Sequence, residues 1–379
     1  MRSMGIVAAT VLAASGSVAS AGPLPQTNTF TVDCDRHETI SGAIARGDVH
    51  KPLVVNIRGT CNEFVAIRRD DVTLHGDPAA TVNAPNLDSD LVTIEANGIT
   101  LENLTLTGGS YGVRQNHGFR FMITNCVIQN TRSDGIRIFV GDTRFVDSTV
   151  QGAGANGVYL TRGGSFGASN SRFLDNASSG ISAYLNSTVS ASGSTISGNG
   201  GNGIDLGAGS QGAVSASTIS GNGADPARFG NGLSGWGGSS AHVGASNVIT
   251  GNREAGILIA GGSTAYVFDN TITGNGGNGV TGYFAATLVI DNGNISSNNG
   301  HGVDCSANCS AQIVGATIQG NAGSGINLAF DSALMLQAPM TSAGGNGGSG
   351  LWCFDKESSV NGLEWFSGTV GLTCTDFDH

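Results

Sequence analysis

Charge is scarce in this chain of 379 residues, and positive charge is the scarcest. Charged residues make up 12% of the sequence, and the formal net charge is −11. The only two lysines are Lys51 and Lys356. Because nucleic acid is bound through a basic face, this composition excludes it as a partner. An anionic polysaccharide would need a bridging cation such as Ca²⁺. No calcium-binding motif supports such a cofactor, and we predict no metal site.

Long apolar runs are also missing, with one exception at the start of the chain. Residues 1–21 combine Arg2, an apolar run over Gly5–Ala14 and a small-residue site at Ala19–Ala21. This is the pattern of a secretory signal peptide. No later segment has the eighteen or so consecutive apolar residues that a membrane span requires. The sequence therefore predicts a secreted protein, extracellular or periplasmic, with no membrane partner.

Glycine, which disfavours helices, occurs 61 times, and Asn, Ser and Thr, which prefer turns or strands, are also abundant. One motif, complete at Ser194–Leu206 (STISGNGGNGIDL), recurs along the chain with a glycine before an aliphatic residue. We call this glycine the mark glycine. Successive marks lie 22 to 25 residues apart, except for one step of 29. They are Gly112, Gly135, Gly157, Gly180, Gly203, Gly232, Gly256, Gly279, Gly302, Gly325 and Gly350. Such a period indicates a repeat architecture in one elongated domain.

Each repeat reads as three short strands separated by Gly, Asn and Ser turns. The residue after every mark glycine is aliphatic, from Val113 to Leu351, so this column is predicted to point inward. The next residue is then predicted to face outward. Four residues before most marks stands an Asn, such as Asn199, and stacked amides can hydrogen-bond from coil to coil. Coils of about 22–23 residues predict an all-β fold, a right-handed parallel β-helix.

The repeat also divides the chain. Residues 1–21 are the predicted signal peptide, 22–89 an N-terminal cap with irregular first coils, 90–350 the regular β-helix, and 351–379 a C-terminal coil and cap. A short amphipathic helix is predicted over His37–Gly47, where apolar residues recur at helical spacing. Such a helix would cover the open end of the strand stack.

Seven cysteines in an exported chain favour disulfides. Closeness in sequence predicts Cys34–Cys61 and Cys353–Cys374 near the two ends and Cys305–Cys309 in a small loop. Six cysteines allow fifteen connectivities, so this pairing is a hypothesis. Cys126 stays single where other repeats carry Ser or Asn. It is predicted to be a small buried residue, not a nucleophile.

The repeat, the amide ladder and the capping helix resemble the right-handed parallel β-helix repeat proteins of the pectin-lyase-like superfamily, over Asp90–Leu351. The resemblance implies that the strand after each mark glycine lines a substrate groove, walled by the loops that enter this strand. No specific enzyme family is matched. The clustered calcium-binding aspartates of pectate lyases and the Asp-Pro-His-Asp motif of alginate-type epimerases are absent. The resemblance therefore implies a fold and not a reaction.

The 29-residue step places an insertion at Gly223–Gly230, directly before a predicted groove strand. Solenoid insertions collect on the functional face. This loop is therefore predicted to bring Asp225, Arg228 and Phe229 near outward-facing Asp205 and Trp236. Asp205 and Asp225 form the only local carboxylate pair that a glycosidase could use. For a lyase, the stacked neighbours Arg114 and Arg137 on the same face are the candidates for neutralising a substrate carboxylate. An ordinary loop insertion remains the alternative.

Aromatic residues are only 6% of the chain, yet several recur in the outward columns. Four of them stand at the fourth position after a mark glycine, on alternate coils. A fifth stands at the second position after a mark glycine, in the other outward column. The predicted ligand-binding set is Phe139, Tyr159, Tyr184, Trp236 and Tyr283. Exposed rings in a row can stack on the apolar faces of sugars. Alternatively, the rings support one another, lie under loops or contact a protein.

Two functions are left open by the sequence. In the first, an exported β-helix protein binds a polysaccharide along its groove and, as an enzyme, cleaves it as a lyase or glycoside hydrolase. In the second, it is a non-catalytic surface, adhesion or structural protein that uses the same aromatic residues to bind a glycan or a protein.

Overall fold

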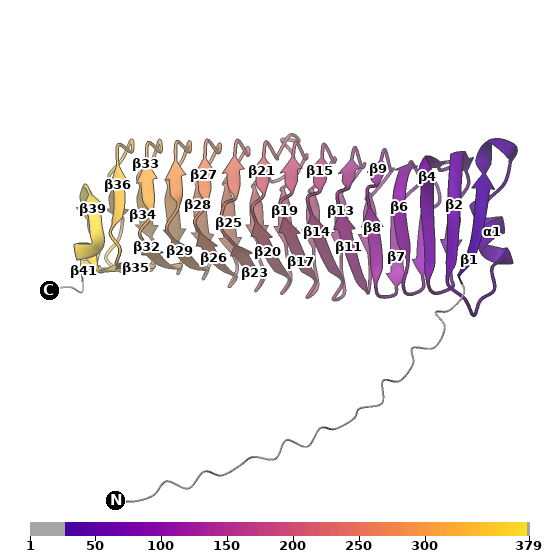
Figure 1. The fold of residues 1–379 in the computed structure, drawn as a ribbon. Helices are drawn as coiled ribbons and strands as arrows, with labels where there is room; N and C mark the ends of the chain where they lie inside the picture. The colour runs from indigo at the N-terminus through magenta and orange to yellow at the C-terminus, as the bar shows by residue number, and fades with distance from the viewer. Residues whose placement is uncertain (1–26, 377–379) are drawn as a thin grey trace, which may run out of the picture.

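Each repeat folds into one coil, and the coils stack along a single axis into a right-handed parallel β-helix (Figure 1). This fold class was predicted from the period and is confirmed. The computed structural model describes residues 27–376, so the predicted signal peptide over residues 1–21 lies outside the described part. Neighbouring coils pair in register, as in Ile204 opposite Leu233. Within the described part of the chain, no helix has the length and hydropathy of a membrane span.

The strands that follow the eleven mark glycines lie in one face, which also includes β3, β5 and β40 at its ends and which we call sheet B. In the described residues it has 14 parallel strands, each paired with the equivalent strand of the next coil. They are β3 (Val65–Ile67), β5 (Val92–Glu95), β7 (Val113–His117), β10 (Ile136–Ile138), β13 (Val158–Leu160), β16 (Ile181–Ala183), β19 (Ile204–Leu206), β22 (Leu233–Gly235), β25 (Ile257–Ala260), β28 (Val280–Tyr283), β31 (Val303–Ser306), β34 (Ile326–Ala329), β37 (Leu351–Cys353) and β40 (Val370–Leu372).

The other two faces belong to a second sheet, which begins with four longer strands. These are β1 (Asn28–Asp33), β2 (Leu53–Asn62), β4 (Val72–Asn83) and β6 (Thr100–Thr107). Because β6 pairs with both β8 and β9, the sheet divides there into two series. The first series is β8 (Phe121–Thr124), β11 (Asp142–Val146), β14 (Ser165–Ser169), β17 (Thr188–Ser192), β20 (Gln211–Ser215), β23 (Ser240–Val243), β26 (Thr264–Phe268), β29 (Thr287–Asp291), β32 (Ser310–Val314), β35 (Ala333–Gln337), β38 (Ser359–Asn361) and β41 (Thr375–Asp376). The second is β9 (Val127–Gln129), β12 (Thr149–Gln151), β15 (Arg172–Leu174), β18 (Thr195–Ser197), β21 (Thr218–Ser220), β24 (Val248–Thr250), β27 (Thr271–Thr273), β30 (Asn294–Ser296), β33 (Thr317–Gln319), β36 (Thr341–Gly344) and β39 (Phe366–Gly368).

The core is the continuous interior of the stacked coils. The aliphatic column after the mark glycines is fully buried, as at Ile136, Ile204 and Val303, each 0% exposed. Buried amides line one corner of the same interior. Asn199 donates through Nδ2 to Oδ1 of Asn222 at 2.8 Å, and Asn222 donates in the same way to Asn252 at 2.9 Å. Apolar columns and amide ladders therefore repeat along the same axis, and every coil supports its neighbours.

The mark glycines are required by the close approach of neighbouring coils. A Cβ atom added to Gly203 would lie 2.5 Å from the carbonyl oxygen of Gly232, the mark of the next coil. The same contact recurs at Gly180, where the distance to the oxygen of Gly203 would be 2.8 Å. Since the obstacle is backbone and not a mobile side chain, no other residue type fits this column without moving a coil.

Gly203→Ala is expected to lower the free energy of unfolding by about 2 kcal/mol, because an overpacked interior must shift backbone to fit. Urea unfolding followed by circular dichroism measures the change. Gly344→Ala is the matched control, since a Cβ there meets no atom within 4 Å. Equal stability of the two variants would contradict this account of the mark glycines.

The N-terminal end is closed by the predicted helix. Helix α1 (Ile40–Arg46) lies inside the predicted range, and the Thr39 side chain caps it by accepting a hydrogen bond from the Gly42 amide at 3.1 Å. Ile40 and Ala43 are buried against the first coil. A short 3-10 helix, η1 (Cys34–Arg36), precedes α1, and another, η2 (Leu363–Trp365), lies near the C-terminal end.

Two of the three predicted disulfides are present, Cys34–Cys61 and Cys305–Cys309. The third predicted pair, Cys353–Cys374, is not bonded in this structure. The two side chains nevertheless interact, since burial and then a hydrogen bond with Cys374 raise the pKa of the Cys353 thiol. Cys126 is 1% exposed, and burial raises the pKa of its thiol to about 12, which fits the predicted small buried residue and not a nucleophile.

Candidate functional site

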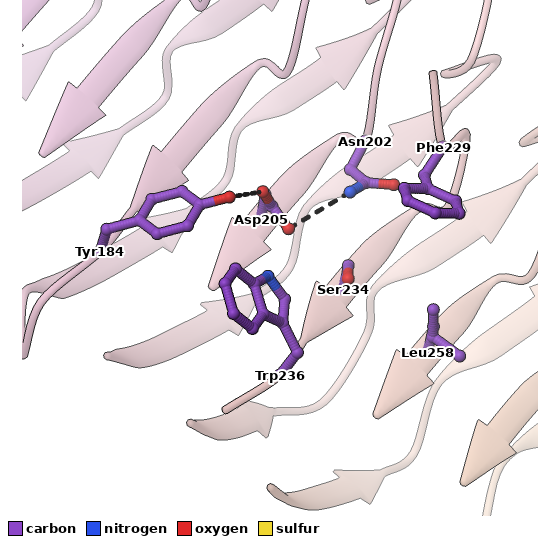
Figure 2. Close-up of a pocket in the computed structure, with 7 residues that line it drawn as sticks. All are labelled: Tyr184, Asn202, Asp205, Phe229, Ser234, Trp236 and Leu258. Atoms are coloured by element: carbon purple, nitrogen blue, oxygen red, sulfur yellow. Dashed lines mark hydrogen bonds between the residues drawn. The ribbon is translucent and has the colours of Figure 1, made fainter. Parts of the chain in front are cut away.

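A pocket of about 340 Å³ opens on the outer face of sheet B, around β19 and β22 (Figure 2). Its lining combines aromatic rings with a few polar groups, the usual composition of a small-molecule site. The side chains that line it belong to Tyr184, Asn202, Asp205, Phe229, Ser234, Trp236 and Leu258. An adjoining hollow of about 240 Å³ shares four of these residues and adds Arg228.

Asp205 lies at the centre of this pocket. Its carboxylate accepts a hydrogen bond from the Tyr184 hydroxyl at 2.6 Å and another from the Asn202 amide at 3.3 Å (Figure 2). Asp205 points outward from the sheet as predicted, but it is only 9% exposed. Burial raises the pKa of Asp205, and hydrogen bonds from Tyr184, Asn202, Ser234 and Trp236 oppose the rise. Several protein donors therefore hold this carboxyl group in place.

Three of the aromatic rings form a continuous patch, although Tyr184 and Trp236 come from alternate coils. Tyr159 and Tyr184 stack with centroids 5.8 Å apart and an interplanar angle of 16°. The Tyr184 and Trp236 rings meet edge to face at 5.6 Å. They close over Gly207, where an added Cβ would lie 2.7 Å from Tyr184 and 2.8 Å from Trp236. The rings that cover Asp205 thus support each other, and Trp236 remains 43% exposed.

The inserted loop supplies one wall of the pocket. Phe229 lines the pocket and is 71% exposed. Arg228 lines the adjoining hollow, where its Nε lies 3.2 Å from Oδ2 of Asp225 and its Nη1 donates to the Ser178 hydroxyl at 3.1 Å. Arg253 holds the loop by donating to the carbonyl oxygen atoms of Asp225, at 2.9 Å, and Arg228. The loop is therefore anchored on a neighbouring coil.

The structure brings together only part of the predicted catalytic set. Asp205 and Arg228 border the same hollow, whereas Asp225 lines neither the pocket nor the hollow. Arg137 lies three coils from Asp205, about 14 Å at the strand spacing of a sheet. It is paired with Asp134 at 2.8 Å, and its guanidinium lies 4.1 Å from the Tyr159 ring centroid.

The predicted ligand-binding rings divide in the same way. Tyr184 and Trp236 line the pocket, and Tyr159 extends their patch. Phe139 instead packs among arginines, with Arg137 at 5.3 Å from its centroid. Tyr283 packs on Phe284 at 3.9 Å, two coils beyond Trp236. The pocket thus uses two of the five predicted rings directly.

One residue of the pocket, Asn202, was missing from the predicted set. Asn202 donates to Asp205, and its own Oδ1 accepts a hydrogen bond from the Asn231 backbone amide at 2.9 Å. The available signal was the position just before the mark glycine, which is polar at Asp134, Asn156, Asn202 and Asn231. Phe229 lines the same pocket as Asp205 and Trp236, the proximity predicted for the insertion, although it was not among the predicted ligand-binding rings.

The pocket and the adjoining hollow offer rings and hydrogen-bonding groups to a ligand, but they do not offer the second carboxyl group that glycosidic cleavage usually requires. That chemistry needs two carboxyl groups roughly 5 to 9.5 Å apart. Among the described residues that line the pocket and hollow, Asp205 has the one carboxyl group. Residues 27–376 also contain no group of three or more His, Cys, Asp or Glu side chains that could hold a metal ion.

Comparison with known proteins bears on the family. A family model described as a right-handed beta helix region matches residues 111–269 and 230–362, which together exceed half of the chain. The chain belongs to the right-handed β-helix family. No curated protein matches this β-helix protein by sequence.

Two solved structures illustrate the shared fold of this β-helix protein. The catalytic unit of the GH87 α-1,3-glucanase from Streptomyces thermodiastaticus is 14% identical, with a TM-score of 0.60 over 88% of this chain and 70% of that one. The A-module of the Azotobacter vinelandii mannuronan C-5 epimerase AlgE4 is 16% identical, with a TM-score of 0.57 over 85% of this chain and 95% of that one. At these identities the likeness establishes the fold alone.

Proposed function

We propose that this β-helix protein binds a polysaccharide along the outer face of sheet B, with one sugar unit in the pocket around Asp205. The observation that carries the proposal is the joined patch of Tyr159, Tyr184 and Trp236 beside buried polar groups. Rings of this kind stack on the apolar faces of sugars, while Asn202 and Ser234 offer hydrogen bonds to hydroxyl groups. Since sheet B runs the length of the solenoid, a long polymer can follow it.

Two further observations support a polysaccharide ligand. The two structurally similar proteins are named as an α-1,3-glucanase and a mannuronan epimerase, and both names refer to polysaccharide substrates. The long insertion of the chain also lies at this pocket, and solenoids carry their binding loops on the functional face. The adhesion or protein-binding alternative has no comparable feature that favours it.

We favour binding over cleavage, and no cofactor is needed for binding. The pocket lining provides one carboxyl group, and the predicted partner Asp225 is held by Arg228 outside it. Export also belongs to the proposal. The disulfides Cys34–Cys61 and Cys305–Cys309 support it, because such bonds persist in oxidising compartments outside the cytosol.

The test is a panel of neutral and acidic polysaccharides. The purified mature chain is run in native gels that contain each polymer, and retention reports binding. Parallel incubations with and without calcium are assayed for new reducing ends and unsaturated products. We expect retention on at least one polymer and no product from any of them. Absence of retention on the whole panel would refute the proposal, and product formation would show that binding is accompanied by catalysis.

A further inference from the structure

We propose that the pocket around Asp205 takes an uncharged sugar unit and disfavours a uronic acid. This inference rests on the proposed function, since it names the chemical class of the sugar bound at the same site. It is decided by the charges around the pocket, because glucans and uronic acid polymers differ in charge more than in ring shape.

The pocket has no cation available for a sugar carboxylate. Among the described residues lining the pocket and the adjoining hollow, Arg228 is the one cation. Its guanidinium already interacts with Asp225 at 3.2 Å and with the Ser178 hydroxyl at 3.1 Å. A uronate placed beside Asp205 would therefore be desolvated without an opposite charge, which is unfavourable.

The arginines elsewhere on sheet B do not supply the missing charge. Arg137 lies three coils from Asp205 and is paired with Asp134 at 2.8 Å. Arg114, one coil further, is paired with Asp90 at 3.2 Å. Both guanidinium groups are thus neutralised by their own carboxylates and lie outside the pocket.

Asp205 itself adds to the selectivity in either protonation state. When ionised it repels an anionic sugar, and when protonated it still provides no positive charge. Its oxygen atoms are mostly occupied, since a carboxylate accepts about four hydrogen bonds and Tyr184, Asn202, Ser234 and Trp236 all donate to it. Sugar hydroxyl groups are left to the remaining polar groups, and the rings take the apolar sugar face.

The first experiment compares matched polymers with the wild-type protein. The pairs are polygalacturonate and its methyl ester, polymannuronate and mannan, and polyglucuronate and β-glucan. Affinity electrophoresis in 1 M NaCl, where the Debye length is about 3 Å, suppresses the effect of the overall negative charge of the protein. We expect the neutral member of the bound pair to bind at least about tenfold more tightly than its uronate counterpart.

The second experiment changes local charge, at 0.15 M NaCl. Asp205→Asn removes the buried charge, and Asp225→Asn releases Arg228 from its ion pair. Each variant is expected to reduce the ratio of the affinities for the neutral and the acidic polymer by about threefold or more. We call this ratio the gap. Asp291→Asn makes the same change in net charge on β29, off sheet B, and is the control expected to leave the gap within about twofold.

The outcomes separate the two proposals. A polyuronate that binds as tightly as, or more tightly than, its neutral counterpart overturns this inference and leaves polysaccharide binding intact. A gap that Asp291→Asn narrows as much as the two pocket variants also overturns it, because the selectivity would then be a property of the whole surface. If no polymer of any pair binds, the proposed function fails and the inference fails with it.

Discussion

Asn222→Asp is expected to lower the free energy of unfolding by about 4 kcal/mol, although it exchanges one atom for another of nearly equal size. The Asn222 amide donates to Oδ1 of Asn252 at 2.9 Å and to the carbonyl oxygen of Ile196 at 3.2 Å. Its Oδ1 accepts from the backbone amide and Nδ2 of Asn199 at 3.2 and 2.8 Å. Every hydrogen-bonding group of this buried side chain is thus used.

An ionised aspartate would break the donating half of this ladder. It would leave the Ile196 carbonyl without its amide partner and place a negative charge against Oδ1 of Asn252 inside the solenoid. Burial would raise the pKa of the introduced carboxyl group. The folded state would then bind its proton more tightly than the unfolded state, so the variant should recover stability as the pH falls through that raised pKa.

Urea unfolding at pH 8 and pH 5 measures both effects. Asn125→Asp is the control, because Asn125 is exposed in a turn with φ 49° and should change stability by no more than about 0.5 kcal/mol. A deficit for Asn222→Asp that is equally small, or that grows as the pH falls, would contradict the structural role assigned to the ladder.

The interior could be predicted because each of its positions recurs in many repeats of the sequence. Ile204 belongs to a column that is aliphatic in all eleven repeats, and Asn222 to a column that is Asn in eight of the eleven. Repetition of this kind averages out the ambiguity of a single residue. The C-terminal coil was harder to predict, because no further repeat defines its register. There, Cys353 lies opposite Leu372, and the predicted bond to Cys374 is not formed although the two side chains interact.

The pocket was less predictable, since it depends on side-chain directions that the period does not specify. Alternation along the strand gave Asp205 its outward direction, but not its burial, which results from Tyr184 and Trp236 leaning together over Gly207. The glycine at that position was the available signal. Within the insertion, the pairing of Asp225 with Arg228 turned an expected catalytic carboxylate into an anchor for the loop.

Trp236→Ala is expected to weaken polysaccharide binding by about 30-fold or more, which corresponds to about 2 kcal/mol. Trp236 is 43% exposed, lines the pocket and meets the Tyr184 ring at 5.6 Å, so its loss removes a stacking surface and the support of a second ring. Affinity electrophoresis on the polymer that the wild-type protein retains gives the change. Trp365→Ala, at a tryptophan 39% exposed in η2 and outside sheet B, is the matched control and should bind normally.

The same substitution gives a second, independent readout at Asp205. Burial is the largest influence on the pKa of Asp205 and raises it, whereas the hydrogen bond from Trp236 lowers it. Removing the indole should let water reach the carboxyl group and replace that hydrogen bond, so this pKa should fall toward that of an ordinary aspartate. An NMR titration of the side-chain carboxyl group in the wild type and the variant measures the difference. Wild-type affinity together with a lowered pKa would mean that Trp236 covers Asp205 but does not contact the sugar. An unchanged pKa would instead contradict the packing of the pocket itself.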